Sequence, residues 1–272
     1  MDITDKVVVV TGAGSGIGEA CAHRFAQLGA KGVLVVDQHA DRTTDVATAI
    51  NDAGGRAAPF VGDIRHEAAT SAAIAEAEKQ FGFVDLFYAN AGIGLGGGAE
   101  VPDDDWLRIW EINVMPHVHA ARALVPQWIE RGGGYLVTTA SAAALLTTLD
   151  SAPYAVTKSA ALSFAEWVSI THHDQGIRVS CLCPQGVRTR MTLGEDLARD
   201  NDGDPGMAQL LASGELLDPG QVADVVARAV ADETFLILPH PEVATYFQRK
   251  AADYDRWLAG MRRLRARSHA GL

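Results

Sequence analysis

The sequence predicts an α/β fold: one Rossmann-type domain built on a doubly wound parallel sheet. Short apolar, β-branched runs alternate along the chain with helical patterns of about 10–15 residues, and glycines directly follow the first of these runs. Strands that alternate with helices predict right-handed βαβ units, in which helices cover both faces of the sheet. No linker or shift in composition marks a second domain within the 272 residues. Residues 1–272 are therefore expected to form a single domain.

The first strand is expected at residues 6–11, where Lys-Val-Val-Val-Val-Thr forms a continuous β-branched run. Such a run is typical of a strand that is buried on both faces. Further strands are expected at residues 32–36, 57–63, 84–90, 135–141, 178–183 and 234–238. Helices are expected at residues 17–28, 41–53, 67–81 and 154–172, and after the N-cap and first-turn pair Asp218-Pro219. Asp103 and Asp104 are expected to cap one more helix.

The charge and the apolar pattern argue against several function classes. The chain has 34 acidic and 23 basic residues, and its net charge of −11 repels phosphate backbones and anionic membranes. Binding to nucleic acid or to a membrane is therefore not expected. No apolar run reaches the roughly 18 residues of a membrane span. The N-terminus also lacks the layout of a signal peptide.

The cysteines and histidines predict neither a disulfide scaffold nor a metal site. The three cysteines are too few for a scaffold, and their odd number is typical of a reducing cytoplasm, where we expect the protein. Cys181 and Cys183 lie two apart on an expected strand, and His117 and His119 lie two apart on an expected helix. Neither pair has further ligands in view. Buried packing is therefore the role expected for the cysteines, and no metal is assigned.

A glycine-rich turn, Thr11-Gly12-Ala13-Gly14-Ser15-Gly16-Ile17-Gly18, joins the first strand to the first helix. Gly12 permits the tight turn, and Gly18 lets the helix and the strand pack closely. Gly16 leaves room for a pyrophosphate near the helix N-terminus, where free N–H groups and the helix dipole favour anions. Alone, such a turn could be an ordinary loop, but its place between a strand and a helix predicts dinucleotide binding. Ser15 and Ile17 are expected to contact the cofactor with these glycines.

Asp37, at the end of the second strand, decides which dinucleotide is expected. Its carboxylate can accept hydrogen bonds from both hydroxyls of the adenosine ribose and would repel a 2′-phosphate. Gln38 follows, and neither that position nor the glycine turn holds a Lys or Arg, so NAD is favoured over NADP. The alternative is that Asp37 only caps the following turn. Asp63 and Ile64, after the third strand, could hold the adenine amino group or form a plain strand-end turn.

The segment Tyr154-Ala155-Val156-Thr157-Lys158 places a phenol and an ammonium one helical turn apart on the same face. A free Tyr has a pKa of about 10, which has to fall by about 3 for the phenol to act as a base near neutrality, a cost of roughly 4 kcal/mol. A neighbouring ammonium and a cationic nicotinamide ring both favour the phenolate. The pattern is that of an acid–base pair, although any helix can carry this spacing by chance.

Four features together resemble the short-chain dehydrogenase/reductase family: TGAGSGIG from Thr11, Asn90-Ala91-Gly92, Ser141, and the YAVTK motif that begins at Tyr154. The similarity extends from residue 6 to about residue 189. Ser141 precedes Tyr154 by thirteen residues, as in that family. Asn113 lies between the Asn-Ala-Gly motif and Ser141, where the family has its fourth catalytic residue.

The resemblance implies a role for each of these residues. Tyr154 would remove the alcohol proton in oxidation or donate it in reduction, and Ser141 would hydrogen-bond the substrate oxygen. Lys158 would lower the pKa of Tyr154 and bind the nicotinamide ribose, and Asn113 would hold a water that links Lys158 to solvent. NAD would carry the redox chemistry. Asn90 would support the sheet and the cofactor wall rather than take part in chemistry.

One segment departs from the family pattern. After the strand at residues 178–183 the family usually has Pro-Gly, whereas this chain has Pro184-Gln185-Gly186-Val187-Arg188-Thr189. Pro184, Val187 and Thr189 are expected to contact the cofactor, the last two at positions that hold the carboxamide in the family. Gln185 occupies the usual glycine place. The loop is therefore expected to take another path, and Gln185 to point into the substrate site.

Two further segments are expected near the site. Residues 192–217 form a Gly- and Asp-containing insertion that could close as a substrate lid, and residues 240–272 form a C-terminal helical extension. The apolar stripe of this extension consists of Val243, Phe247, Tyr254, Trp257, Leu258, Met261 and Leu264. The stripe predicts packing on the core or on a sister subunit, with a membrane-surface helix as the alternative. Its aromatic residues could also reach the substrate mouth.

These observations predict an NAD(H)-dependent oxidoreductase that transfers a hydride between nicotinamide and a secondary alcohol or ketone. The apolar residues 142–146 and Leu95 suggest an apolar pocket, and hence a lipophilic or alicyclic substrate. The resemblance implies a homodimer or homotetramer built on helices of the core. Two alternatives stay open. One is an epimerase or dehydratase that borrows the hydride transiently, and the other is a non-catalytic, dinucleotide-sensing regulator, which would be expected to lack part of the catalytic tetrad.

Overall fold

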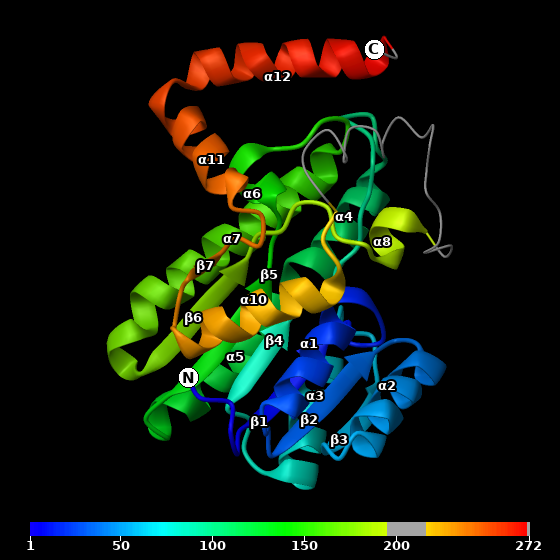
Figure 1. The fold of residues 1–272 in the computed structure, drawn as a ribbon, viewed down its shortest axis with the longest axis vertical. Helices are drawn as coiled ribbons and strands as arrows, with labels where there is room; N and C mark the ends of the chain where they lie inside the picture. Colours follow the sequence, from blue (N-terminus) through cyan, green and yellow to red (C-terminus); the bar gives the residue numbers. More distant parts are fainter. Residues whose placement is uncertain (195–215, 271–272) are drawn as a thin grey trace.

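The computed structural model describes residues 1–194 and 216–270, which form a seven-stranded parallel sheet with helices on both faces (Figure 1). The strand order is β3-β2-β1-β4-β5-β6-β7. The order reverses between β1 and β4, so that neighbouring crossovers leave the sheet in opposite directions. This topology is that of a doubly wound sheet, and the predicted Rossmann-type fold in a single domain is confirmed.

The strands are β1 (Val7–Thr11), β2 (Gly32–Asp37), β3 (Ala57–Val61), β4 (Leu86–Ala89), β5 (Gly134–Thr139), β6 (Ile177–Leu182) and β7 (Leu236–Ile237). The helices of the α/β body are α1 (Gly16–Gln27), α2 (Ala40–Asp52), α3 (Glu67–Phe81), α4 (Asp103–Asn113), α5 (Met115–Glu130), α6 (Ala142–Leu146), α7 (Ala152–His172), η1 (His173–Gln175), α8 (Arg190–Leu193) and α10 (Pro219–Ala231). The C-terminal helices are α11 (Glu242–Ala252) and α12 (Tyr254–His269).

Two apolar layers hold the sheet, one on each face. Successive valines of β1 point to opposite faces: Val7 and Val9 pack in the layer of α3, α5 and α7, whereas Val8 and Val10 pack in the layer of α1, α2 and α10. Every residue of β1 is buried. This two-sided burial explains why the strand is a continuous apolar run rather than an alternating one.

Of two predicted helix caps, the structure confirms one and contradicts the other. Asp218 caps α10 as predicted and forms a capping box with Gln221. The prediction that Asp103 and Asp104 cap a helix is wrong, because Pro102 is the N-cap of α4 and no side chain caps it. The two carboxylates lie in the first turn of α4, where the positive end of the helix dipole favours them.

Three of the expected strands are markedly longer than the strands in the structure, two at the sheet edges and one at its centre. The expected strands at 57–63 and 234–238 shorten to β3 and β7, which are the two edge strands and have a neighbour on one side only. The strand expected at 84–90 likewise shortens to β4. The sequence also gave no signal for α6, a helix of five residues directly after Ser141.

In the C-terminal segment the apolar stripe is divided between two helices, α11 and α12. Asp253 ends α11 and caps α12, its carboxylate accepting a 3.0 Å hydrogen bond from the Arg256 amide. Val243 of α11 is fully buried, whereas α12 has no buried residue and extends beyond the α/β body at the top of Figure 1. Among the described residues, no helix is both long and apolar enough to cross a membrane. Most of the lid expected at 192–217 lies outside the described residues.

Trp128 of α5 tests the packing of the layer that contains α3, α5 and α7. Its side chain is fully buried, and its indole N–H donates to the Val84 carbonyl at 2.8 Å. We expect Trp128→Ala to lower the free energy of unfolding by about 3–5 kcal/mol, because it leaves a cavity and an unpaired carbonyl. Phe83→Ala is the control, because Phe83 is 60% exposed, and it should cost less than about 1 kcal/mol. Urea denaturation followed by circular dichroism measures the free energy of unfolding of both variants. Equal losses of this free energy would contradict the placement of Trp128 in the buried layer.

Candidate active site

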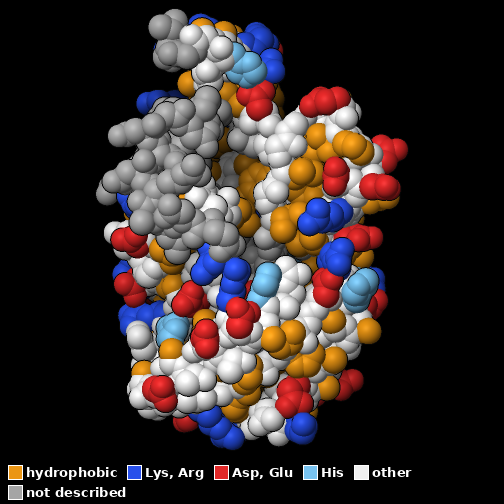
Figure 2. All heavy atoms as spheres, turned by 90° about the vertical axis from the view of Figure 1, so that its right-hand side faces the viewer, with side chains coloured by type: hydrophobic (Ala, Val, Ile, Leu, Met, Phe, Trp, Pro, Cys, Tyr) orange, Lys and Arg blue, Asp and Glu red, His pale blue; other side chains and the backbone are white. Residues whose placement is uncertain are grey.

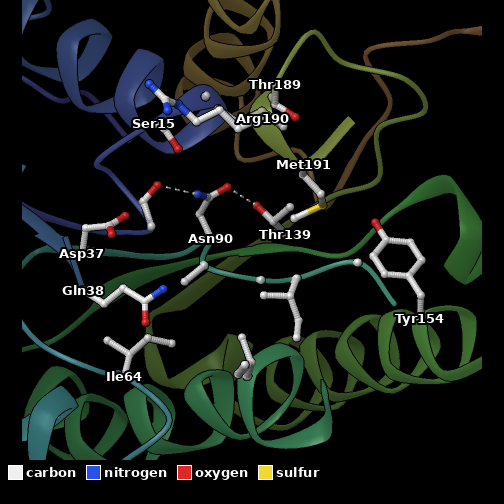
Figure 3. A pocket seen from close by; sticks show the side chains of 18 of the residues that line it. Ser15, Asp37, Gln38, Ile64, Asn90, Thr139, Tyr154, Thr189, Arg190 and Met191 are labelled. Atoms are coloured by element: carbon white, nitrogen blue, oxygen red, sulfur yellow. Dashed lines mark hydrogen bonds between the residues drawn. The ribbon is translucent and has the colours of Figure 1, made fainter. Parts of the chain in front are cut away.

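A cavity of about 850 Å³ opens at the carboxyl ends of the strands, where β1 and β4 form the switch point of the sheet. Figure 2, which views the molecule from the right-hand side of Figure 1, shows a hollow near the middle of this face with hydrophobic side chains along one side. In Figure 3 Asp37 and Gln38 lie at one end of the pocket and Tyr154 at the other, with Asn90 and Thr139 between them. The cavity is thus long and joins the glycine turn to the Tyr154 helix.

The turn after β1 has the backbone that a bound pyrophosphate needs. Gly16 has a φ of +60°, a conformation that L side chains rarely adopt. A Cβ on Gly18 would overlap the Gly12 carbonyl, so only glycine allows this contact between the turn and α1. Ser15 is the N-cap of α1, and among the described residues its side chain makes no capping hydrogen bond. The first-turn amides of α1 are therefore not capped by Ser15 and can receive an anion.

Asp37 and Asp63 line the end of the cavity where the adenosine is expected, and both carboxylates form local hydrogen bonds. The carboxylate of Asp37 accepts hydrogen bonds of 3.1 Å from the amides of Gly14 and His39. It therefore caps the turn and also lines the cavity. Asp63 accepts hydrogen bonds of 3.0 and 2.9 Å from Nε of Arg65, which hold the pKa of the Asp63 carboxyl below its ordinary value. The strand-end turn expected as the alternative at Asp63 is present, and Asp63 lines the cavity as well.

A chain of hydrogen bonds crosses the floor of the cavity from the glycine turn to α7. The Asn90 amide donates to the carbonyls of Thr11 and Gly12 at 3.1 and 3.4 Å. Its Oδ1 accepts from the Thr139 hydroxyl at 3.0 Å, as drawn in Figure 3. The Thr139 carbonyl in turn accepts from Nζ of Lys158 at 3.0 Å. Asn90 thus links the glycine turn to Thr139, a residue that the sequence analysis did not single out.

Tyr154 and Lys158 lie one turn apart near the N-terminus of α7. Nζ of Lys158 is 5.6 Å from the centre of the Tyr154 ring, and the Lys158 side chain is only 2% exposed. Burial lowers the pKa of Lys158 to about 8. Burial also raises the pKa of Tyr154 above that of an ordinary phenol, and the neighbouring Ser141 hydroxyl offsets this only in part. The pKa of Tyr154 in this structure therefore moves opposite to the expected direction.

Ser141 and Asn113 lie directly behind the cavity wall rather than in its lining. The Ser141 hydroxyl accepts a 3.1 Å hydrogen bond from the Ala143 amide and so caps α6. Asn113 is fully buried, and its amide pairs with the backbone of Ile93 through bonds of 2.8 and 3.0 Å. Asn113 therefore fixes the loop after β4. One turn further on, burial lowers the pKa of His117 to about 3, which keeps this imidazole neutral.

The structure brings most of the expected cofactor contacts into the cavity lining. These are Gly12, Ser15, Gly16, Ile17, Asp37, Asp63, Ile64, Asn90, Tyr154, Lys158, Pro184, Val187 and Thr189. Gly18 packs behind the turn. The expectation that residues 142–146 line an apolar pocket is wrong, because these residues form α6 and its buried side chains pack on the core. Leu95 does line the cavity, together with Ile93 and Met191.

No group of three or more His, Cys, Asp or Glu side chains suited to a metal ion occurs among residues 1–194 and 216–270. Cys181 and Cys183 are fully buried with free thiols. Both rings of the expected helical pair, His117 and His119, are also buried. All four side chains are buried, and both ring nitrogens of His117 lack a hydrogen-bond partner among the described residues.

Comparison with known proteins places this site in a family. Residues 6–199 match the family described as short chain dehydrogenase. Oxidoreductase UcpA of Escherichia coli (strain K12) is 31% identical over 240 residues, which cover 85% of this chain and 90% of the relative. Meso-2,3-butanediol dehydrogenase of Serratia marcescens is 30% identical over 239 residues, covering 87% and 92%. A solved short chain dehydrogenase/reductase from Burkholderia phymatum in complex with NAD has a TM-score of 0.83 and 29% identity, and the match covers 94% of this chain and 96% of that one. The chain therefore belongs to the short-chain dehydrogenase/reductase family and is an oxidoreductase of that family.

Proposed function

We propose that the protein transfers a hydride between NAD(H) and a secondary alcohol or its ketone. The observation that carries this proposal is the cavity itself, which is lined at one end by the glycine turn and Asp37 and at the other by Tyr154 and Lys158. A non-catalytic regulator would need the dinucleotide end of the cavity but not the acid–base pair of Tyr154 and Lys158 at the other end. An absorbance change at 340 nm with NAD and a panel of secondary alcohols tests the proposal. Substrate conversion without net NADH would indicate the epimerase or dehydratase alternative instead.

The residues present suit a nicotinamide dinucleotide. The uncapped first turn of α1 would hold the pyrophosphate, and Asp37 would accept hydrogen bonds from the adenosine ribose. Asp63 and Ile64 would border the adenine, and Pro184, Val187 and Thr189 would border the nicotinamide. When bound, the cofactor supplies the hydride acceptor or donor. The known complex of the Burkholderia phymatum protein contains NAD, which supports NAD here.

The chain's own residues would move the proton and orient the substrate. Tyr154 would accept the alcohol proton in oxidation and return it in reduction. The Ser141 hydroxyl would hydrogen-bond the substrate oxygen beside it. Lys158, held by the Thr139 carbonyl, would keep a positive charge next to the phenol and favour its ionised form. Asn113 would keep the wall at Ile93 in place, and we retain the proposal that it holds a water that links Lys158 to solvent.

The substrate end of the cavity favours an apolar alcohol or ketone. Ile93, Leu95 and Met191 line it with aliphatic and thioether side chains. Exposing such a wall to water is unfavourable, and a substrate that covers the wall with apolar surface removes this cost. The name of the Serratia marcescens relative refers to a small secondary alcohol with two hydroxyls, which is consistent with this class. We therefore propose a secondary alcohol on an apolar skeleton.

We also propose a homo-oligomer in a reducing cytoplasm. Val156, Trp167 and Ile170 share one face of α7, and their side chains are 47%, 56% and 83% exposed. The Trp167 ring stacks on Phe164 with centroids 6.3 Å apart, which orders this apolar surface. An apolar helix face of this kind is typical of an interface with another subunit. The three free, buried cysteines support the cytoplasm as the compartment.

The Tyr154 hydroxyl is the first test of the mechanism. We expect Tyr154→Phe to reduce kcat at least about a thousandfold, because the proton of the substrate hydroxyl loses its acceptor. The dissociation constant of NADH, measured by fluorescence, should change less than threefold, since the ring stays in place. A variant that keeps more than a tenth of wild-type kcat would remove Tyr154 from the mechanism.

Lys158 is expected to support the reaction at a cost in stability. A pKa of about 8 instead of 10.5 corresponds to about 3 kcal/mol of destabilisation. The folded state binds fewer protons than the unfolded state between these two values, so this cost is complete below pH 8 and disappears as the pH rises from 8 to about 10.5. Lys158→Met also loses the bond to Thr139, which is worth about 1 kcal/mol.

We therefore expect Lys158→Met to be inactive and yet about 2 kcal/mol more stable than the wild type at pH 7. Urea denaturation between pH 7 and 10 measures the difference, which should shrink as the pH rises. Lys79→Met is the control, because the Lys79 side chain is exposed. The effect of this substitution on stability should not vary over this pH range. A variant destabilised at pH 7 would contradict the expected cost of the buried charge.

Asp37 tests the choice of NAD over NADP. We expect the wild type to have the higher kcat/KM with NAD, because the carboxylate repels a 2′-phosphate. Asp37→Ser should lower kcat/KM for NAD about tenfold and raise it for NADP about tenfold. Asp41→Asn removes the same charge from the exposed surface of α2 and should leave the preference unchanged. Faster turnover of the wild type with NADP would refute the role given to Asp37.

A further inference from the structure

Gln185 lies beside the group that is proposed to bind the substrate oxygen. It is the second residue after Cys183, in the loop that leaves β6. The carbonyl of the preceding Pro184 accepts a 2.8 Å hydrogen bond from the Ala142 amide and is 3.5 Å from the Ser141 hydroxyl. The Gln185 side chain therefore begins one residue from the partner of Ser141, close to where the reacting oxygen would bind.

The backbone of this loop is fixed by His240, a residue of the C-terminal extension. His240 is only 3% exposed, and both of its ring nitrogens are engaged. The Gln185 amide donates to Nδ1 at 3.2 Å. Nδ1 must therefore be unprotonated, so that Nε2 carries the hydrogen and donates to the Gly186 carbonyl at 3.1 Å. This neutral imidazole bridges two successive residues and limits how far the Gln185 backbone can turn.

The Gln185 side chain lines the cavity with an unused hydrogen-bonding group. Its Oε1 is enclosed, yet it has no hydrogen-bond partner among residues 1–194 and 216–270. A buried amide oxygen left without a donor is unfavourable, because it has lost its hydrogen bonds to water. Leu95 and Met191, which also line the cavity, offer no donor, and the Ser151 hydroxyl next to them already donates to the Leu95 carbonyl at 2.6 Å. Figure 3 places Met191 and Tyr154 toward the end of the pocket opposite Asp37.

We propose that Gln185 is a specificity-determining residue that hydrogen-bonds a second oxygen of the substrate. Because Gln185 is adjacent to the Ser141 partner, this oxygen is on a carbon next to the reacting one. The substrate class is then a vicinal diol or the corresponding α-hydroxyketone on an apolar skeleton. This inference rests on the proposed function, and it narrows that function from secondary alcohols to vicinal diols.

The test compares matched substrates in the wild type and in Gln185→Leu, which keeps most of the side-chain volume and removes its hydrogen bonds. The pairs are 1,2-cyclohexanediol with cyclohexanol, and 2,3-butanediol with 2-butanol. We expect the wild type to oxidise each diol with at least tenfold higher kcat/KM than its mono-alcohol. Gln185→Leu should lose this tenfold preference, equivalent to about 1.4 kcal/mol. A wild type without the preference would overturn the inference, while turnover of the mono-alcohols would still support the proposed function.

Two binding measurements, the rise in Tm with ligand and the dissociation constant of NADH, test the role of Gln185 without turnover. The rise in Tm of the NADH complex should be larger with 2-hydroxycyclohexanone than with cyclohexanone in the wild type and equal in Gln185→Leu. This comparison applies even if no alcohol is turned over, which would count against the proposed function alone. The dissociation constant of NADH, measured by fluorescence, should be the same in both proteins. A tenfold weaker NADH complex in Gln185→Leu would mean that Gln185 contacts the cofactor, and it would overturn the inference.

Discussion

The buried ammonium of Lys158 is the constraint on which the site depends. A charge that is 2% exposed has to be hydrogen-bonded, and the Thr139 carbonyl at the end of β5 supplies the acceptor. The hydroxyl of the same threonine binds Asn90, which binds the backbone of the glycine turn. Three strand ends and α7 are thereby joined by one polar chain. The two ends of the cavity consequently cannot move independently, and the phenol of Tyr154 keeps a fixed position relative to the dinucleotide turn.

Local patterns predicted the centre of the fold and the polar residues of the site. The glycine turn, Asp37 and the Tyr154–Lys158 pair are encoded within a few residues, and burial on both faces makes β1 a continuous apolar run. The edge strands and α6 were missed or shortened because their ends depend on contacts with distant segments. His240 illustrates the same limit, since its partners Gln185 and Gly186 lie more than 50 residues away in the chain. No local signal marks such a contact.

The acidity of Tyr154 shows where sequence spacing alone is insufficient. The spacing correctly places an ammonium one turn from the phenol, but it says nothing about how deeply both groups are buried. In the structure burial disfavours the phenolate and also lowers the pKa of Lys158 to about 8. A site of this kind ionises its phenol only when further positive charge offsets burial. An oxidised nicotinamide ring is the positive charge that the proposed function would add, so that proton removal would be favoured only with the cofactor in place.

The C-terminal extension contacts segments that border the cavity, although α12 lies beyond the α/β body in Figure 1. Its contacts fall on the segments that border Ser141 and Tyr154: Nζ of Lys250 donates to the Leu145 carbonyl at 2.7 Å, and Arg265 pairs with Asp150 at 3.0 Å. The second contact is exposed at both partners, and such pairs contribute little to stability. The contacts of His240 are buried, and breaking them would leave polar backbone groups without partners. His240, in the part of the extension nearest the sheet, therefore fixes the backbone of the loop that lines the cavity at Gln185. Helix α12 has no buried residue and contacts the α/β body through the partly buried Trp257 and through Arg265.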